Sequence, residues 1–229
     1  MKVAIHQPEH LPWLGFFYKM SLSDVLILLD DTQFQKEGFQ NRNRIKTKEG
    51  WQWSTIPVLK DSFQPINTIK INNKVNWRRK NVEAIKANYA KAPFFKMYFP
   101  MVESIYQQEW NSLCELNCAI ITALAKELGI TTKVVLSSHL AAEGSRNEKL
   151  LNLCKKVNAT TYICGQGAAE YFDEKLFSTS NIKVEYSQFQ HPHYNQLHGQ
   201  FVPAMSALDL LMNHGPEGKK ILLEVKLKI

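Results

Sequence analysis

Cysteine is scarce in this sequence, with four residues in a chain of 229. Two of them, Cys114 and Cys118, lie one helical turn apart in a segment of helical character. No histidine or second cysteine pair stands near them at the spacing of a zinc site. Cysteines so few and so scattered exclude a disulfide framework, and we expect both side chains in the core.

Long apolar segments are also missing. No stretch approaches the roughly 18 to 20 apolar residues that a helix needs to cross a bilayer. The first residues already form a predicted strand, which leaves no room for a signal peptide. We therefore expect a cytoplasmic protein without a membrane span.

Several catalytic motifs are absent as well. The sequence has no Walker loop, no Gly-x-Ser-x-Gly elbow and no His-Glu-x-x-His motif. His191 and His193 lack a recognisable third ligand, so we predict no metal site, and no pattern identifies a cofactor. Cys164 ends an apolar run and could act as a nucleophile near His6 or His191, although burial as a small apolar side chain explains it more simply.

The charge is unbalanced toward the positive side. Lysine and arginine together number 28 against 21 aspartates and glutamates, which gives a formal net charge of +7. Such a surplus suits an anionic partner, whether nucleic acid, a phosphorylated small molecule, an acidic glycan or a membrane face. It is equally compatible with an ordinary solvated surface.

What the sequence does contain is a series of apolar runs, each followed by polar residues. Unbroken apolar runs are typical of strands buried on both faces of a parallel sheet, and ligands bind beyond the carboxyl ends of such strands. The five runs span residues 3–5, 25–29, 132–136, 160–164 and 182–186. We predict one α/β domain over residues 1–229, with a three-layer Rossmann-like, mostly parallel sheet and a helical segment over residues 75–129.

An antiparallel insertion is expected after the second run, over residues 39–71. Gly50 separates two alternating segments, as in a β-hairpin. Arg42, Arg44 and Lys46 occupy alternate positions, so they share one face of the first strand. That basic face suits a phosphate or a carboxylate, or it is simply the exposed side of a hairpin.

The polar ends of the apolar runs carry the candidate chemistry. His6 is a candidate general acid or base, although a histidine at a strand end can also be a satisfied core residue. Asp30, with Asp31 beside it, could bind Mg²⁺ or sugar hydroxyls, or the pair could cap a turn. Gly165 and Gly167 allow a close approach between the backbone and a ligand, ahead of a helix N-terminus that favours anions.

The chain also resembles the WbqC-like family of bacteria, in ordered segments that cover nearly its whole length. These read HQPEHLPWLGFFYKM, SDVLILLDDTQFQK, FQNRNRIKT, GWQWSTIPV, TYICGQGAAEYFD and FQHPHYNQLHGQFVPAMSALDLLMNHG. The resemblance implies a transferase of bacterial surface-polysaccharide (O-antigen) biosynthesis, since family members are encoded among such genes. It further implies transfer of an acyl or aminoacyl group to a nucleotide-linked amino sugar, from an acyl donor or a carrier protein.

The residues and the resemblance together define a predicted site. We predict catalytic roles for His6, Asp30 and His191. The family often has tyrosine where this chain has His10, so we do not expect a required catalytic imidazole at that position. The predicted substrate-binding residues are Gln7, Gln33, Asn41, Arg42, Arg44, Lys46, Gly165, Gly167, Tyr171, Tyr194, Gln196 and Asp209.

Two other functions stay open. A strand ending in His6, then His10 and a helix, is similar in architecture to nucleotidyltransferases that act on ATP phosphates with paired histidines, although the spacing here is wider and an intervening glycine is missing. Basic residues beside Trp51 and Trp53 would suit stacking on single-stranded nucleic acid. Nucleic acid is nevertheless not the expected partner, because binding at the hairpin would leave the polar residues at the strand ends without a role.

Overall fold

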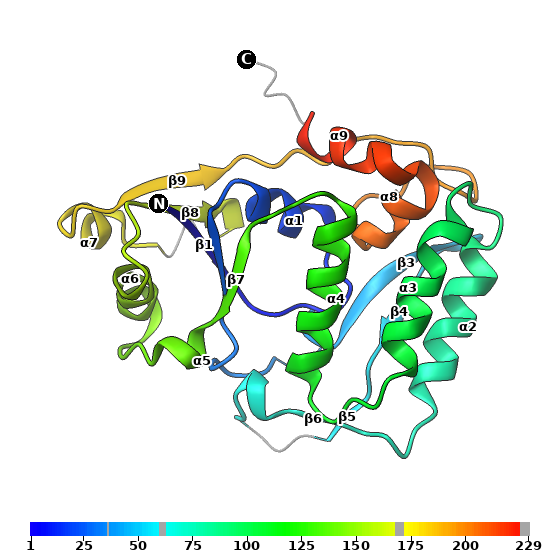
Figure 1. The fold of residues 1–229 in the computed structure, drawn as a ribbon, viewed down its shortest axis with the longest axis horizontal. Coiled ribbons are helices and arrows are strands. Elements are labelled where there is room, and N and C mark those ends of the chain that lie inside the picture. Colours follow the sequence, from blue (N-terminus) through cyan, green and yellow to red (C-terminus); the bar gives the residue numbers. More distant parts are fainter. Residues whose placement is uncertain (36, 60–62, 168–171, 225–229) are drawn as a thin grey trace.

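The computed structural model describes residues 1–35, 37–59, 63–167 and 172–224. Its centre is a five-stranded sheet with strand order β7-β2-β1-β8-β9, in which every pair of neighbours is parallel (Figure 1). The strands are β1 (Lys2–His6), β2 (Val25–Leu28), β7 (Lys133–Leu136), β8 (Thr161–Gly165) and β9 (Lys183–Ser187). All five predicted runs are strands, and the Rossmann-like α/β prediction is confirmed.

Two apolar clusters, one on each face of the sheet, hold the helices against it. Successive strand residues point to opposite faces, so Val3 and Ile5 pack in one cluster and Ala4 in the other. The first cluster includes side chains of α6 (Arg146–Lys156) and α7 (Glu174–Ser178). The second is larger and includes side chains of α1 (Leu14–Ser21), α4 (Leu113–Glu127) and α8 (Ala207–His214).

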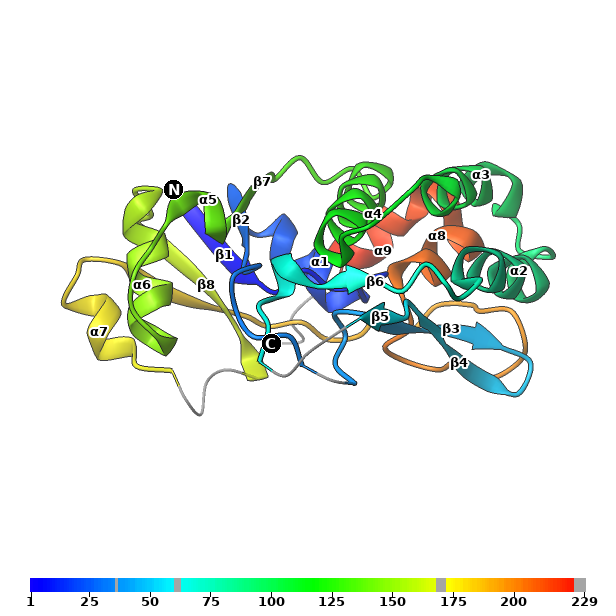
Figure 2. The ribbon, with the colours of Figure 1, turned by 90° about the horizontal axis from the view of Figure 1, so that it is seen from below.

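The segment between β2 and β7 supplies the remaining antiparallel and helical parts. The predicted hairpin is confirmed as β3 (Arg42–Thr47) and β4 (Gly50–Thr55), which lie to one side of the parallel sheet together with α2 (Trp77–Tyr89) and α3 (Phe95–Gln107) (Figure 2). The shorter elements are β5 (Val58–Leu59), β6 (Lys70–Ile71), α5 (Ser137–Leu140), α9 (Gly218–Leu223) and 3₁₀ turns at Ile66–Thr68 and Gly215–Glu217. The one-domain organisation stays a prediction. Within the described ranges, no helix has both the length and the apolar character needed to cross a bilayer.

Candidate functional site

The strand order creates a crevice between β1 and β8. From β1 the chain proceeds outward to β2 and β7 on one side, then returns to add β8 and β9 on the other. In open parallel sheets, ligands bind outside the carboxyl ends of the strands at this point of reversal. A cavity of about 630 Å³ lies there, and we call it the switch-point crevice. Its lining includes His6, Gln7, Lys19, Gly165 and Gly167.

His6 enters the crevice as a neutral imidazole. Its Nδ1 lies 3.1 Å from the Gln7 carbonyl oxygen, which can only accept, so Nδ1 carries the proton and Nε2 keeps its lone pair. Burial, helped by the nearby positive charge of Lys19, lowers the pKa of His6 to about 3. The side chain is 27% exposed, which leaves it within reach of a ligand in the crevice.

Lys19 is the crevice residue that the sequence did not reveal. It lies on α1, is only 6% exposed, and donates from Nζ to the Ile5 carbonyl oxygen at 2.9 Å. Burial lowers its pKa to about 8, against the opposing effects of Cys164 and Glu9. The available signal was a single lysine in the otherwise apolar and aromatic segment LGFFYKM. Its position puts a cation where an anionic ligand group would lie.

Glu9 is a second unpredicted participant, just behind His6. Its Oε1 is 3.7 Å from His6 Nδ1, and its Oε2 is buried without a hydrogen-bond partner among the described residues. Burial raises the pKa of Glu9 to about 7, and the Lys19 charge opposes the rise. His6 and Lys19 therefore line the cavity with displaced pKa values, and Glu9, whose pKa is also displaced, lies behind His6. Such clusters are characteristic of functional sites.

Glycines keep the β8 side of the crevice open. A Cβ atom on Gly165 would lie 4.0 Å from Lys19 Nζ, so a longer side chain there would occupy the space beside the amine. A Cβ on Gly167 would meet nothing within 4 Å. Cys164, the preceding residue, is fully buried and burial raises the pKa of its thiol, which argues for the apolar interpretation over the nucleophilic one.

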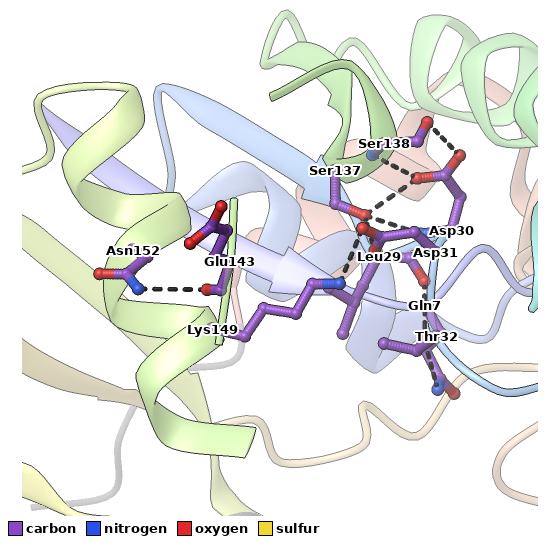
Figure 3. A network of polar contacts seen from close by, with 10 residues as sticks. All are labelled: Gln7, Leu29, Asp30, Asp31, Thr32, Ser137, Ser138, Glu143, Lys149 and Asn152. Atoms are coloured by element: carbon purple, nitrogen blue, oxygen red, sulfur yellow. Dashed lines mark hydrogen bonds and ion pairs between the residues drawn. The ribbon is translucent and has the colours of Figure 1, made fainter. Parts of the chain in front are cut away.

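Asp30 lies outside the crevice, in a network at the ends of β2 and β7 (Figure 3). Its Oδ1 accepts from the Ser137 hydroxyl at 2.9 Å and the Ser138 amide at 2.9 Å, and its Oδ2 accepts from the Ser138 hydroxyl at 2.7 Å. Asp31 pairs with Lys149 of α6 at 2.7 Å. These contacts give Asp30 a structural task, and its catalytic role stays a prediction.

Replacing Asp30 with asparagine is expected to lower the free energy of unfolding by about 1 to 3 kcal/mol. The amide keeps the size of the carboxyl but turns one acceptor into a donor, which leaves a buried serine contact unsatisfied. Urea denaturation measures the change, with Asp31→Asn as the more exposed comparison. If Asp30→Asn unfolds like the wild type, the network is not stabilising.

The basic residues of the hairpin separate into two environments. Arg42 stacks on Trp53, with its guanidinium carbon 4.3 Å from the ring centroid, and Arg44 stacks on Trp51 at 5.1 Å. Lys46 is instead 1% exposed and donates from Nζ to the His198 carbonyl oxygen at 3.0 Å. The three alternate as predicted, but only the arginines reach the surface.

Three other predicted binding residues form a buried network away from the crevice. The Asp209 carboxylate accepts from Tyr194 at 2.9 Å, from Gln196 at 2.8 Å and from the Tyr89 hydroxyl at 2.9 Å. Asp209 is fully buried, and burial raises its pKa although these bonds act in the opposite direction. Gln196 also exchanges two hydrogen bonds with the Val202 backbone, so these side chains already have partners inside the protein.

The remaining predicted residues lie at separate positions in the fold. His191 packs against Phe189, which lines the crevice, and its Nδ1 is 2.9 Å from the Pro192 carbonyl oxygen. Asn41 donates to the Ile56 carbonyl oxygen at 2.9 Å, and Gln33 forms an isolated antiparallel bridge with Pro65. Tyr171 lies outside the described residues. Of the predicted set, His6, Gln7, Gly165 and Gly167 are brought together in the crevice, whereas His191 only contacts its lining residue Phe189.

Comparison with known proteins places the chain in a family. The sequence model of the WbqC-like protein family matches residues 7–221. "Uncharacterized protein Rv1507c" of Mycobacterium tuberculosis is 36% identical over 219 residues, which cover 94% of this chain and 95% of that protein. No solved structure matches the chain. The chain belongs to the WbqC-like protein family.

Proposed function

We propose that the chain is a transferase of bacterial surface-polysaccharide biosynthesis that moves an acyl or aminoacyl group to a nucleotide-linked amino sugar. The observation that carries the proposal is the switch-point crevice, in which the Nε2 lone pair of His6, the buried amine of Lys19 and the open backbone at Gly165 adjoin one cavity. The transferase part of the proposal rests on what the resemblance to this family implies, since family members are encoded among surface-polysaccharide genes. Lys19 attracts the diphosphate of the ligand, and His6 faces the sugar amine.

The proposed step balances in protons and bonds. The sugar amine attacks the acyl carbonyl, the new C–N bond forms, and the bond from the acyl group to its carrier breaks. His6 Nε2 takes the proton that the amine releases and returns it to the leaving group. A ligand diphosphate near His6 raises the pKa of the imidazole from its low unliganded value, because negative charge favours the protonated form.

Glu9 supports His6 in this step. When Nε2 accepts a proton, the ring becomes a cation, and the Glu9 carboxylate 3.7 Å from Nδ1 stabilises that charge. Catalytic hydrogen bonds are often long before the substrate binds and shorten in the complex. The pKa of Glu9, about 7, places the exchange of its proton near neutral pH.

A nucleotidyltransferase-like reaction requires two imidazoles at one phosphate. His10 is fully buried, its Nε2 lies 3.0 Å from the Tyr106 hydroxyl, and it does not line the crevice. The second imidazole is thus engaged elsewhere, which favours the transferase.

A ligand panel tests the proposal by thermal unfolding. The panel holds nucleotide-linked amino sugars, acyl-coenzyme A, and ATP with Mg²⁺. A ligand present at about a hundred times its dissociation constant stabilises by roughly 2.7 kcal/mol, a rise in Tm of about 5 to 10 °C for a chain of this size. We expect the shift with a nucleotide-linked amino sugar and its loss in His6→Ala. A shift with ATP and Mg²⁺ alone contradicts the transferase.

Replacing Glu9 with glutamine is expected to remove a pH dependence of stability. The pKa of Glu9 is raised from 4.5 to about 7, so between these pH values the folded chain binds more protons than the unfolded chain, and stability falls as pH rises. Glutamine resembles the protonated form at every pH. Unfolding free energies should match the wild type near pH 4 and exceed it by up to about 3 kcal/mol near pH 8. A difference that stays constant over this range would show that Glu9 ionises normally.

A further inference from the structure

The β3–β4 hairpin lies to one side of the parallel sheet (Figure 2), and exposed aromatic residues lie on it and just before it. Phe39, Trp51 and Trp53 are 41%, 42% and 37% exposed. The ring centroids of Trp51 and Trp53 are 5.2 Å apart, and those of Phe39 and Trp53 are 6.3 Å apart. Three large rings in contact with one another therefore form a continuous exposed surface, which we call the hairpin platform.

Two arginines add uncompensated charge to this platform. Arg42 lies over Trp53 and Arg44 over Trp51, and the buried Nε atoms of both have no hydrogen-bond partner in the described ranges. Among the residues that the structure describes, neither guanidinium has a carboxylate within 4.0 Å. Within the described part of the chain, the one hydrogen bond of these side chains runs from Arg42 to the Glu37 carbonyl oxygen. Both arginines are partly exposed, so their positive charge is available to an external anion.

The chemistry of the platform selects the class of ligand. Guanidinium and indole N–H groups donate hydrogen bonds and cannot accept them. The two strands read RNRIKT and GWQWST, without an acidic residue. The hydroxyls of a glycan need acceptors as well as donors, whereas phosphate oxygens only accept and bases are flat enough to stack on aromatic rings.

We propose that Phe39, Arg42, Arg44, Trp51 and Trp53 form a binding site for single-stranded nucleic acid. Bases stack on the exposed rings, and the guanidinium groups contact the phosphates between them. None of the five residues lines the switch-point crevice, so this site is distinct from the proposed transferase site. The net charge of +7 favours the same kind of partner.

Fluorescence titration of the full chain with an oligouridine of about ten nucleotides tests the site. We expect tryptophan emission to be quenched, because Trp51 and Trp53 are exposed. Trp53→Ala should weaken binding about 5- to 100-fold, the range for loss of one stacked base. Arg42→Gln should reduce the slope of log affinity against log salt by about 0.7, since one phosphate contact is lost. The exposed arginine Arg79, on α2, provides the control Arg79→Gln, which should leave affinity and slope unchanged.

Arg44→Met is a second platform variant, and it keeps an apolar contact with Trp51. The Tm values of Arg44→Met and Trp53→Ala verify that both variants fold. Unaltered binding in both folded variants would overturn the site. The proposal would also be wrong if dextran sulfate binds as tightly as oligouridine, since the platform then recognises only negative charge. Absence of binding to oligouridine at low salt is equally contrary to it.

Discussion

Asp209→Ala is expected to lower the free energy of unfolding by about 1 to 3 kcal/mol. Asp209 lies in the first turn of α8 and is fully buried. Its two oxygens accept from Tyr89, Tyr194 and Gln196, which come from α2 and from the segment before α8. Alanine would leave these donors without their acceptor, and an unpaired buried polar group costs far more than the bond contributes when intact.

Urea denaturation monitored by tryptophan fluorescence measures this loss. Asp209→Asn keeps the shape and one acceptor oxygen, so it should lose less stability than the alanine variant. Glu83→Ala removes an exposed carboxylate, 59% accessible and paired with Arg79, and should change stability by at most about 0.5 kcal/mol. A loss below about 1 kcal/mol in Asp209→Ala would mean that the network does not hold α8 to α2.

Lys19→Met is expected to weaken binding of a nucleotide-linked amino sugar by at least about 30-fold. The Lys19 amine is the buried cation of the crevice, and truncating one partner of a buried charge contact has an effect of this size. Stability should not fall with it. Burial lowers the pKa of Lys19 to about 8, which means that burying the charged amine costs free energy of folding. An apolar side chain of similar length removes this cost.

Isothermal titration calorimetry of wild type and Lys19→Met gives the affinities, and Lys133→Met on the exposed start of β7 is the matched control. Lys19 also has a pH signature of its own. Between pH 8 and 10.5 the unfolded chain holds a proton that the folded chain has lost, so the wild type gains stability as pH rises and Lys19→Met does not. If Lys19→Met keeps full affinity and loses the rise of stability between pH 8 and 10.5, the anionic group of the ligand does not bind at Lys19.

The sheet and part of the crevice follow from local sequence pattern. Five apolar runs predicted five strands, and the polar residues after them identified His6, Gly165 and Gly167, because the carboxyl ends of parallel strands meet at one edge. Lys19 and Glu9 did not stand out. Their burial depends on how α1 and the turn after β1 pack against the sheet, which is a non-local property.

The same limit explains the predicted residues that lie elsewhere. Asp209 and Tyr194 have the chemistry of ligand-binding groups, yet their partner Tyr89 is 120 residues from Asp209 in the sequence. Asp30 likewise bonds Ser137 across 107 residues. A sequence shows that such side chains are polar and near strand or helix ends. The sequence does not show that these side chains are hydrogen-bond partners of one another.

The most direct test of the switch-point crevice as the ligand site is backbone-amide NMR with a nucleotide-linked amino sugar. We expect the largest shifts at Gln7, Gly165, Gln166 and Gly167, which line the crevice, and their loss in His6→Ala. Shifts confined to Asp30 and Ser138, or to the hairpin, would contradict it and move the site to those residues.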